Sequence, residues 1–287
     1  MKLIDTHAHL NFAAFDADRE TVIENSLAEG IFAINVGVNF ESSRAAATIA
    51  QKYETGVWAA IGLHPENIKN ISEEGRADAG EGIALENIKE PGFDSESYRR
   101  LAQTFGKIVA IGETGLDYLR LPKNAVRAEK IRANQKEVFK KQLALAKDLD
   151  LPVIVHSRMA HDDMMAALKE FAGAKGYVRG VMHCFSGTAG EAREIYGLGM
   201  CFGLNGIIFK LNLDEAVKQM PLDRILLETD CPYLSPLPQT KRNEPRHVLE
   251  VAKRVAAIRN EPAETIIAAA TENARSLFGI EIDQTRL

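Results

Sequence analysis

Leu3-Ile4-Asp5-Thr6-His7-Ala8-His9-Leu10 is the stretch around which the chain is organised. It has the pattern of a short apolar strand that ends in two histidines. Alternate residues of an extended strand point to the same face, so His7 and His9 project side by side. Neutral imidazole is the commonest side-chain ligand of transition metals, and two on one strand end provide half of a metal site. A His-x-His pair alone is equally compatible with two buried core histidines, so the rest of the chain decides.

Seven further β-like runs follow, and helical patterns separate most of them. They cover residues 31–36, 57–63, 107–112, 151–155, 180–182, 200–204 and 224–227. Strands that alternate with helices form a parallel sheet, and eight such units close into a barrel. An open doubly wound sheet usually has a glycine-rich phosphate loop after its first strand, and this sequence has none. The sequence predicts one α/β domain over residues 1–287, a (β/α)8 TIM barrel.

Helices are also expected at particular places. A long helix is predicted over about 133–148, and two tail helices over about 246–258 and 262–278. The glycine- and glutamate-rich residues 66–98 are predicted to be an insertion at the barrel mouth, with a helix near 83–89.

The composition limits the classes of protein to which this chain can belong. The 287 residues are 46% hydrophobic and 26% charged, which is typical of a soluble globular protein. No apolar run approaches the ~20 residues of a membrane span, and Met1-Lys2-Leu3 leads into a strand rather than a signal peptide. The three cysteines have no C-x-x-C spacing, which favours the reducing cytoplasm, and Cys184 and Cys231 are expected to face the core. The net charge of −5 provides no general basic field for nucleic acid, so a polyanionic substrate would be attracted locally, by metal ions and a few basic loop residues.

Polar residues recur where the predicted strands end. Besides the first histidine pair, they are His64, Glu113, His156, His183 and Asp230. In a (β/α)8 barrel the carboxyl ends of all strands open onto one face, which holds the active site. We therefore expect these side chains to converge at one mouth.

The convergence predicts a metal site of particular chemistry. Four histidines and two carboxylates exceed the needs of one tetrahedral site with an open position. Two ions bridged by a carboxylate would use them all, and such a pair suits the hydrolysis of phosphoesters, amides or esters. Asp230 is the candidate base that accepts a proton. Glu228 lies two residues earlier on the same face and is expected to orient the ligands.

Six motifs along nearly the whole chain resemble a known family. They are residues 5–10 (DTHAHL), 62–65 (GLHP), 112–118 (GETGLDY), 152–158 (PVIVHSR), 183–187 (HCFSG) and 228–234 (ETDCPYL), followed by KRNEP at 241–245. Together they resemble the TatD-like metal-dependent deoxyribonucleases, within the amidohydrolase-like superfamily of metal-dependent hydrolases.

The resemblance implies a function and a set of ligands. The family removes nucleotides from the 3′ ends of DNA with a divalent metal, so the implied activity is that of a 3′–5′ exodeoxyribonuclease. It implies that His7, His9 and Asp230 hold one ion, that His156 and His183 hold a second, and that Glu113 bridges them. His64 is implied to contact a substrate phosphate or to support the ligands. The ions are left open among Mg, Mn and Zn, because the family often uses magnesium whereas imidazole-rich sites favour softer metals.

The basic residues near the predicted mouth are candidates for binding DNA phosphates. Arg158, Lys241 and Arg242 lie on loops there, although ordinary surface charges are the alternative. The expected partner is DNA, single-stranded or at a 3′ end, and a monomer is favoured. Met159 stands where the family commonly has an acidic residue, and residues 238–240 also depart from its pattern.

Two rival functions have the same ligands. One is a small-molecule amidohydrolase or esterase, and the other is a metal-binding scaffold without activity. Many dinuclear amidohydrolases bridge their metals with a carboxylated lysine, whereas the fourth strand here ends in Glu113. That difference favours the deoxyribonuclease.

Overall fold

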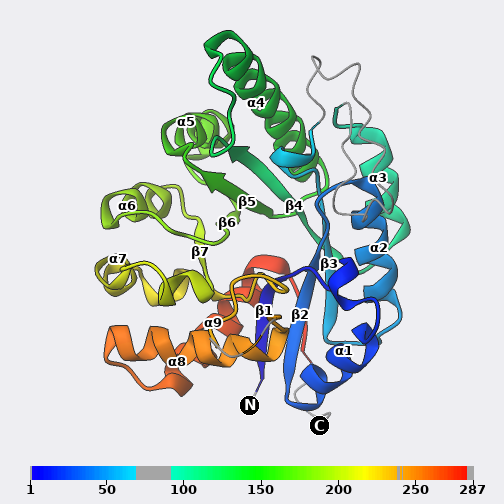
Figure 1. The fold of residues 1–287 in the computed structure, drawn as a ribbon, viewed down its shortest axis with the longest axis vertical. Coiled ribbons are helices and arrows are strands. Elements are labelled where there is room, and N and C mark those ends of the chain that lie inside the picture. Colours follow the sequence, from blue (N-terminus) through cyan, green and yellow to red (C-terminus); the bar gives the residue numbers. More distant parts are fainter. Residues whose placement is uncertain (1, 69–91, 238–239, 241, 283–287) are drawn as a thin grey trace.

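The fold is a barrel of eight parallel strands. The computed structural model describes residues 2–68, 92–237, 240 and 242–282. In this part of the chain the strands lie side by side in the order of the sequence (Figure 1). They are β1 (Leu3–Ala8), β2 (Ile31–Val36), β3 (Val57–Ile61), β4 (Ile108–Asp117), β5 (Val153–Arg158), β6 (Gly180–Met182), β7 (Cys201–Leu204) and β8 (Ile225–Leu227). The predicted TIM barrel is confirmed.

Helices surround these strands (Figure 1). They are α1 (Arg19–Ala28), α2 (Phe40–Gln51), α3 (Ser95–Thr104), α4 (Ala125–Asp148), α5 (His161–Ala172), α6 (Ala189–Gly197), α7 (Asp214–Gln219), α8 (Val248–Arg259) and α9 (Ala263–Phe278). Helix α4 begins eight residues before its predicted start, because Asn124 accepts a hydrogen bond from the amide of Arg127 and caps it there. The helix predicted near 83–89, like most of the insertion predicted over 66–98, lies outside the described residues. No helix in the described part of the chain is long and apolar enough to span a membrane.

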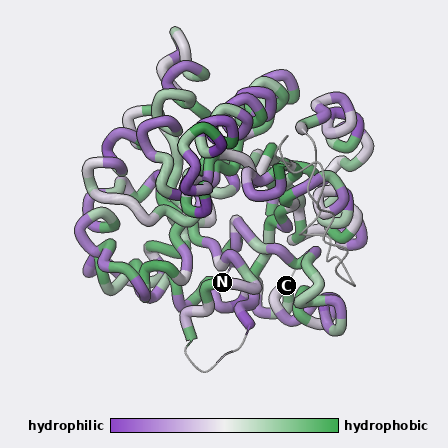
Figure 2. The backbone as a smooth tube through the Cα atoms, turned by 45° about the horizontal axis from the view of Figure 1, so that its top comes forward, coloured by the Kyte–Doolittle hydropathy of each residue, from purple (hydrophilic) through white to green (hydrophobic). Residues whose placement is uncertain are grey.

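The buried side chains form two layers. One fills the barrel interior, where Ile34, Trp58 and Leu226 meet Phe278 at the end of α9. The other lies between the strands and the surrounding helices and includes Phe139 and Val251. Figure 2 colours the chain by hydropathy and shows hydrophobic segments interspersed with hydrophilic ones throughout the tube. Burial on both faces is expected of parallel strands covered by helices.

An irregularity in the pairing of β1 sets the direction in which its histidines point. Leu3 and Ala8 both belong to the outer layer although their positions have opposite parity in an alternating strand. The pairing of β1 with β2 shifts between Asp5 and Ala8, as at a β-bulge. The shift places His7 and His9, rather than their neighbours, on the side of the barrel mouth.

The barrel closes where β1 meets the chain after β8. The amide of Asp230 donates to the carbonyl of His7 at 2.9 Å, and that of His9 donates to Cys231 at 2.8 Å. Buried Asp5 accepts hydrogen bonds from the amide and the hydroxyl of Thr229. The closure therefore brings residues 230 and 7–9 together from opposite ends of the chain.

Candidate metal centre

The predicted polar residues meet at the mouth of the barrel. A cavity of about 590 Å³ lies there, and His7 is fully buried beneath it. Six of the seven predicted side chains line it: His9, His64, Glu113, His156, His183 and Asp230. The convergence expected from the ends of the strands is thus present in the structure.

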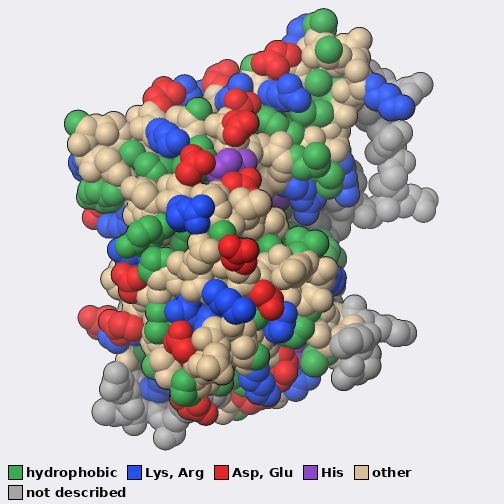
Figure 3. Space-filling view, turned by 90° about the vertical axis from the view of Figure 1, so that its left-hand side faces the viewer, with side chains coloured by type: hydrophobic (Ala, Val, Ile, Leu, Met, Phe, Trp, Pro, Cys, Tyr) green, Lys and Arg blue, Asp and Glu red, His purple; other side chains and the backbone are tan. Residues whose placement is uncertain are grey.

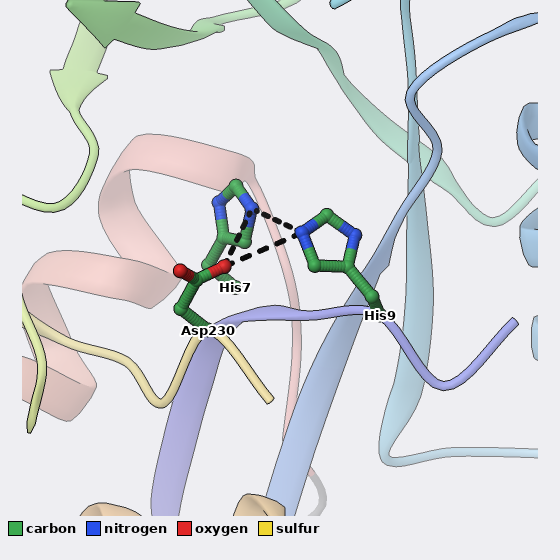
Figure 4. Close-up of side chains that lie close together, drawn as sticks. All are labelled: His7, His9 and Asp230. Carbon is green, nitrogen blue, oxygen red and sulfur yellow. Dashed lines mark hydrogen bonds and ion pairs between the residues drawn. The ribbon is translucent and has the colours of Figure 1, made fainter. Parts of the chain in front are cut away.

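The first group of donors joins β1 to the end of β8. The Nε2 atoms of His7 and His9 lie 3.2 Å apart. Asp230 Oδ1 lies 3.9 Å from the first and 3.4 Å from the second (Figure 4). Asp230 has a positive φ of 57°, unusual for a residue other than glycine, which turns its side chain back over β1. His7, His9 and Asp230 could therefore hold one ion.

The second group of donors surrounds one carboxylate oxygen of Glu113, Oε1. Oε1 of this carboxylate lies 2.9 Å from His156 Nδ1, 3.5 Å from His64 Nε2 and 3.7 Å from His183 Nε2. Oε2 faces the first group instead, 3.4 Å from His7 Nε2. The carboxylate thus lies between two sets of imidazoles, with one oxygen toward each. His64, Glu113 and His156 could hold a second ion.

The outer ring nitrogens of two histidines are already engaged. His9 Nδ1 lies 2.9 Å from the carbonyl of Val36, to which it can only donate. His183 Nδ1 lies 2.8 Å from the carboxylate of Glu228. When either ring is neutral, these contacts keep its proton on Nδ1, so that its Nε2 can present a lone pair to a cation. Lone pairs and carboxylate oxygens that all point inward are complementary to cations.

The spacing of the donors also fits metal ions. Ligands at about 2.0–2.1 Å from a tetrahedral ion are separated from one another by roughly 3.3 Å. The separations between His7, His9, Glu113 and Asp230 run from 3.2 to 3.9 Å. The residues present therefore fit divalent ions in both their chemistry and their spacing.

The surroundings of the site shift the pKa values of its ionisable groups. Burial opposes ionisation of Glu113, but the surrounding histidines outweigh it and hold its pKa well below the usual range. Burial lowers the pKa of His64 to about 3, so this imidazole is neutral. Burial also opposes protonation of His183, but the charges of Glu228 and Glu113 outweigh it and raise its pKa to about 10. The carboxylates thus stay anionic and available to cations.

Asp117 is a site residue that the sequence analysis missed. Its Oδ2 lies 2.9 Å from His156 Nε2, on the far side of the ring from Glu113. The side chain is almost fully buried, and its amide binds the side chain of Gln135. Glu113 and Asp117 are four residues apart on one extended strand, β4, so the alternation of the strand provided a signal for finding it.

Glu228 lies where it was expected to act, behind the ligands. Besides its contact with His183, it accepts hydrogen bonds from the amide of Cys184 and the amide group of Asn205. Its side chain is 1% exposed. These contacts fix the orientation of His183 and leave Glu228 away from solvent.

Two predicted phosphate-binding residues have different fates in the structure. Arg158 lines the cavity, with 47% of its side chain exposed and Nη1 3.7 Å from Asp117. Arg242 does not line it: its guanidinium binds Asp18 and Glu244 and lies over the ring of Phe15. In the structure Arg242 therefore braces the chain after β8 against the start of α1, and its role in binding a phosphate stays a prediction.

The remaining basic residues near the mouth are Lys241 and Arg120. Lys241 lies outside the described residues. Arg120 was not predicted, yet it lines the cavity with 77% of its side chain exposed and forms an ion pair with Glu66 at 3.4 Å. It follows β4, so its place on a strand-end loop was the available signal.

Cys184 corrects another expectation. Cys231 is buried as predicted, but Cys184 is only partly buried and lines the cavity. Its φ of 47° interrupts the alternation on which the prediction rested. The thiol lies close enough to His183 and Asp230 for the three to form a potential ligand group.

The barrel and its donors define a class, the metal-dependent hydrolases built on a TIM barrel. The model of the family described as TatD related DNase matches residues 4–279. The chain belongs to this family.

Individual relatives agree over the full chain. An uncharacterized metal-dependent hydrolase, YabD of Bacillus subtilis, is 40% identical over 97% of this chain and 99% of its own. The 3′-5′ ssDNA/RNA exonuclease TatD of Klebsiella pneumoniae is 32% identical over 98% of this chain and 99% of its own. The crystal structure of YJJV, a TatD homolog from Escherichia coli, superposes with a TM-score of 0.78 at 29% identity, covering 97% of this chain and 98% of that one.

Proposed function

We propose that the protein is a dinuclear metal-dependent deoxyribonuclease that removes nucleotides from the 3′ end of single-stranded DNA. The observation that carries the proposal is the position of Glu113, whose two oxygens face two separate groups of histidines. A carboxylate held in this way suits two ions rather than one.

Each group of donors has a part in the proposal. His7, His9 and Asp230 would hold the first ion, His156 and His183 would hold the second, and Glu113 would serve both. His64 joins the second group: its Nε2 lies 3.5 Å from Glu113, and its neutral imidazole is a donor rather than a charged partner for a phosphate. We infer that the protein acts in the cytoplasm, on the 3′ ends of DNA.

The chain's own residues complete the chemistry. Bound divalent ions would polarise the scissile phosphate and lower the pKa of a water. Asp230 presents Oδ1 to the histidines, which leaves Oδ2 to accept the proton of the attacking water. Arg158 and Arg120, both exposed at the cavity, neutralise the phosphates of the strand.

The substrate follows from the family and from these charges. The Klebsiella relative is named a 3′-5′ exonuclease of ssDNA and RNA. The described part of the cavity adds two arginines to a chain whose net charge is −5, which is the local attraction that a polyanion needs.

The proposal is tested with single-stranded DNA labelled at its 5′ end. The protein is incubated with magnesium, manganese or zinc, beside the variant Asp230→Asn. A metal-dependent ladder of shortened, labelled products that is absent with the variant is expected. Products of internal cleavage, or the absence of cleavage with every metal, would contradict the proposal. In the second case hydrolysis of small-molecule esters and amides is tested next.

A further inference from the structure

A second cavity opens beside the metal centre. It has a volume of about 640 Å³ and lies between the chain after β5 and the chain after β6. Ser157, His183, Cys184 and Ser186 line both this cavity and the central one. The two cavities therefore meet at the metal centre.

One wall of the second cavity is apolar. Met182, Phe185 and Ile195 are buried beneath it, while Met159 lies at its edge with 74% of its surface exposed. Met159 has a positive φ of 53°, which holds it out from the end of β5. Methionine, phenylalanine and isoleucine side chains can pack against the face of a planar ring.

Carboxylates also line the second cavity. Asp162, in the first turn of α5, makes no hydrogen bond or ion pair with the other described residues. Glu191 uses Oε2 to bind the amide of Thr188, but its Oε1 lies 3.7 Å from the ring of His161. A histidine flanked by acidic side chains is visible on the face to which α5 and α6 contribute (Figure 3). These oxygens can accept hydrogen bonds from an entering molecule.

The charges of the two cavities differ in sign. Of the other charged residues that line the second cavity, Asp163 already binds the Tyr118 hydroxyl at 2.7 Å, and Arg132 lies over the Tyr118 ring. Asp162 and Glu191 therefore make this side anionic, whereas Arg120 and Arg158 make the central cavity attractive to phosphates. A DNA backbone is favoured in one cavity and repelled from the other.

We propose that the second cavity binds the base of the 3′-terminal nucleotide, and that the rest of the strand leaves past Arg120 and Arg158. This inference rests on the proposed nuclease function. The base lies against Met159, and its exocyclic amino group donates to Asp162. Cytosine, adenine and guanine carry such a group and thymine does not, so the site discriminates against a terminal thymidine.

The test compares oligonucleotides that differ only in their 3′-terminal base. We expect kcat/KM for a terminal dC to exceed that for a terminal dT by about fivefold, the worth of one hydrogen bond to an exposed carboxylate. Asp162→Asn moves this ratio toward one. Met159→Ala, a change at an exposed side chain that folding does not require, raises KM for all four ends.

The control and the contrary results are equally specific. Glu264 is an exposed carboxylate in the first turn of α9 and lines neither cavity, so Glu264→Gln leaves the ratio at its wild-type value. Cleavage of all four ends with equal kcat/KM, or an equal effect of Asp162→Asn on all of them, would overturn the base site alone. The absence of cleavage of every oligonucleotide would overturn the nuclease function itself.

Discussion

At the mouth of the barrel the histidines are oriented through contacts that lie outside the donor cluster. His9 is held by the carbonyl of Val36, His183 by Glu228 and His156 by Asp117. Such contacts fix both the rotation of the ring and the nitrogen that carries the proton. The same metal-facing donors without these partners would be free to rotate, and the centre would lose its geometry.

Asp117→Asn tests this positioning role. Asparagine has nearly the same shape, but its amide oxygen accepts a hydrogen bond less strongly than a carboxylate oxygen does. We expect metal affinity or kcat to fall by about 10–100-fold, as is usual when the outer partner of a metal-binding histidine is replaced. Circular dichroism and the thermal midpoint check that the fold is retained. Unchanged metal affinity and kcat would show that His156 does not depend on this contact.

Substitutions of the two arginines predicted from the sequence, Arg158 and Arg242, are expected to have different effects on KM and on stability. Arg158→Ala removes an exposed charge at the cavity, so KM for DNA rises by about tenfold and depends less on salt. Arg242→Ala instead removes the brace to Asp18, so the thermal midpoint falls while KM changes by about twofold or less. An increase in KM with Arg242→Ala as large as with Arg158→Ala would return Arg242 to the substrate site.

At the scale of elements, strand β4 is the part of the barrel that depends most on glycine. Gly115 has a φ of 146°, a conformation that residues with a side chain rarely adopt. A Cβ at this position would collide with the carbonyl oxygen of His156 on β5. The close approach of β4 and β5 lets Glu113, Asp117 and His156 meet.

Gly115→Ala therefore tests whether the spacing of β4 and β5 is needed both for stability and for metal binding. We expect the free energy of unfolding to fall by more than about 1 kcal/mol, with a loss of metal affinity because β5 must move away. Gly106→Ala is the control, since a Cβ there meets nothing within 4 Å. Denaturant titration and metal binding measure both effects. Equal stability of the two variants would show that the β4–β5 spacing is not constrained.

The order of strands and the histidine pair were predictable from sequence because they depend on local periodicity. Alternation placed His7 beside His9, and the short apolar runs marked all eight strands. The same rule failed at Cys184 and could not foresee the bulge in β1, because both depend on a backbone conformation that no periodicity reveals. The ion pair of Arg242 could not be foreseen because its partner, Asp18, lies 224 residues away.

At the scale of the whole molecule, the closure of the barrel assembles the centre. Asp230 reaches His7 and His9 only because the chain after β8 is hydrogen-bonded to the end of β1. Glu113 comes from the middle of the sequence and faces both groups of histidines. The site is thus a property of the closed barrel, and no single segment contains it.

The most direct test of the dinuclear centre is to titrate metal-free protein with manganese or zinc while following both bound metal and DNA cleavage. We predict about two ions per chain, with cleavage that appears as the second ion binds. Glu113→Gln is expected to bind less metal and to lose cleavage, while remaining folded. Full cleavage with one ion per chain, or cleavage by metal-free protein in the presence of a chelator, would contradict the account.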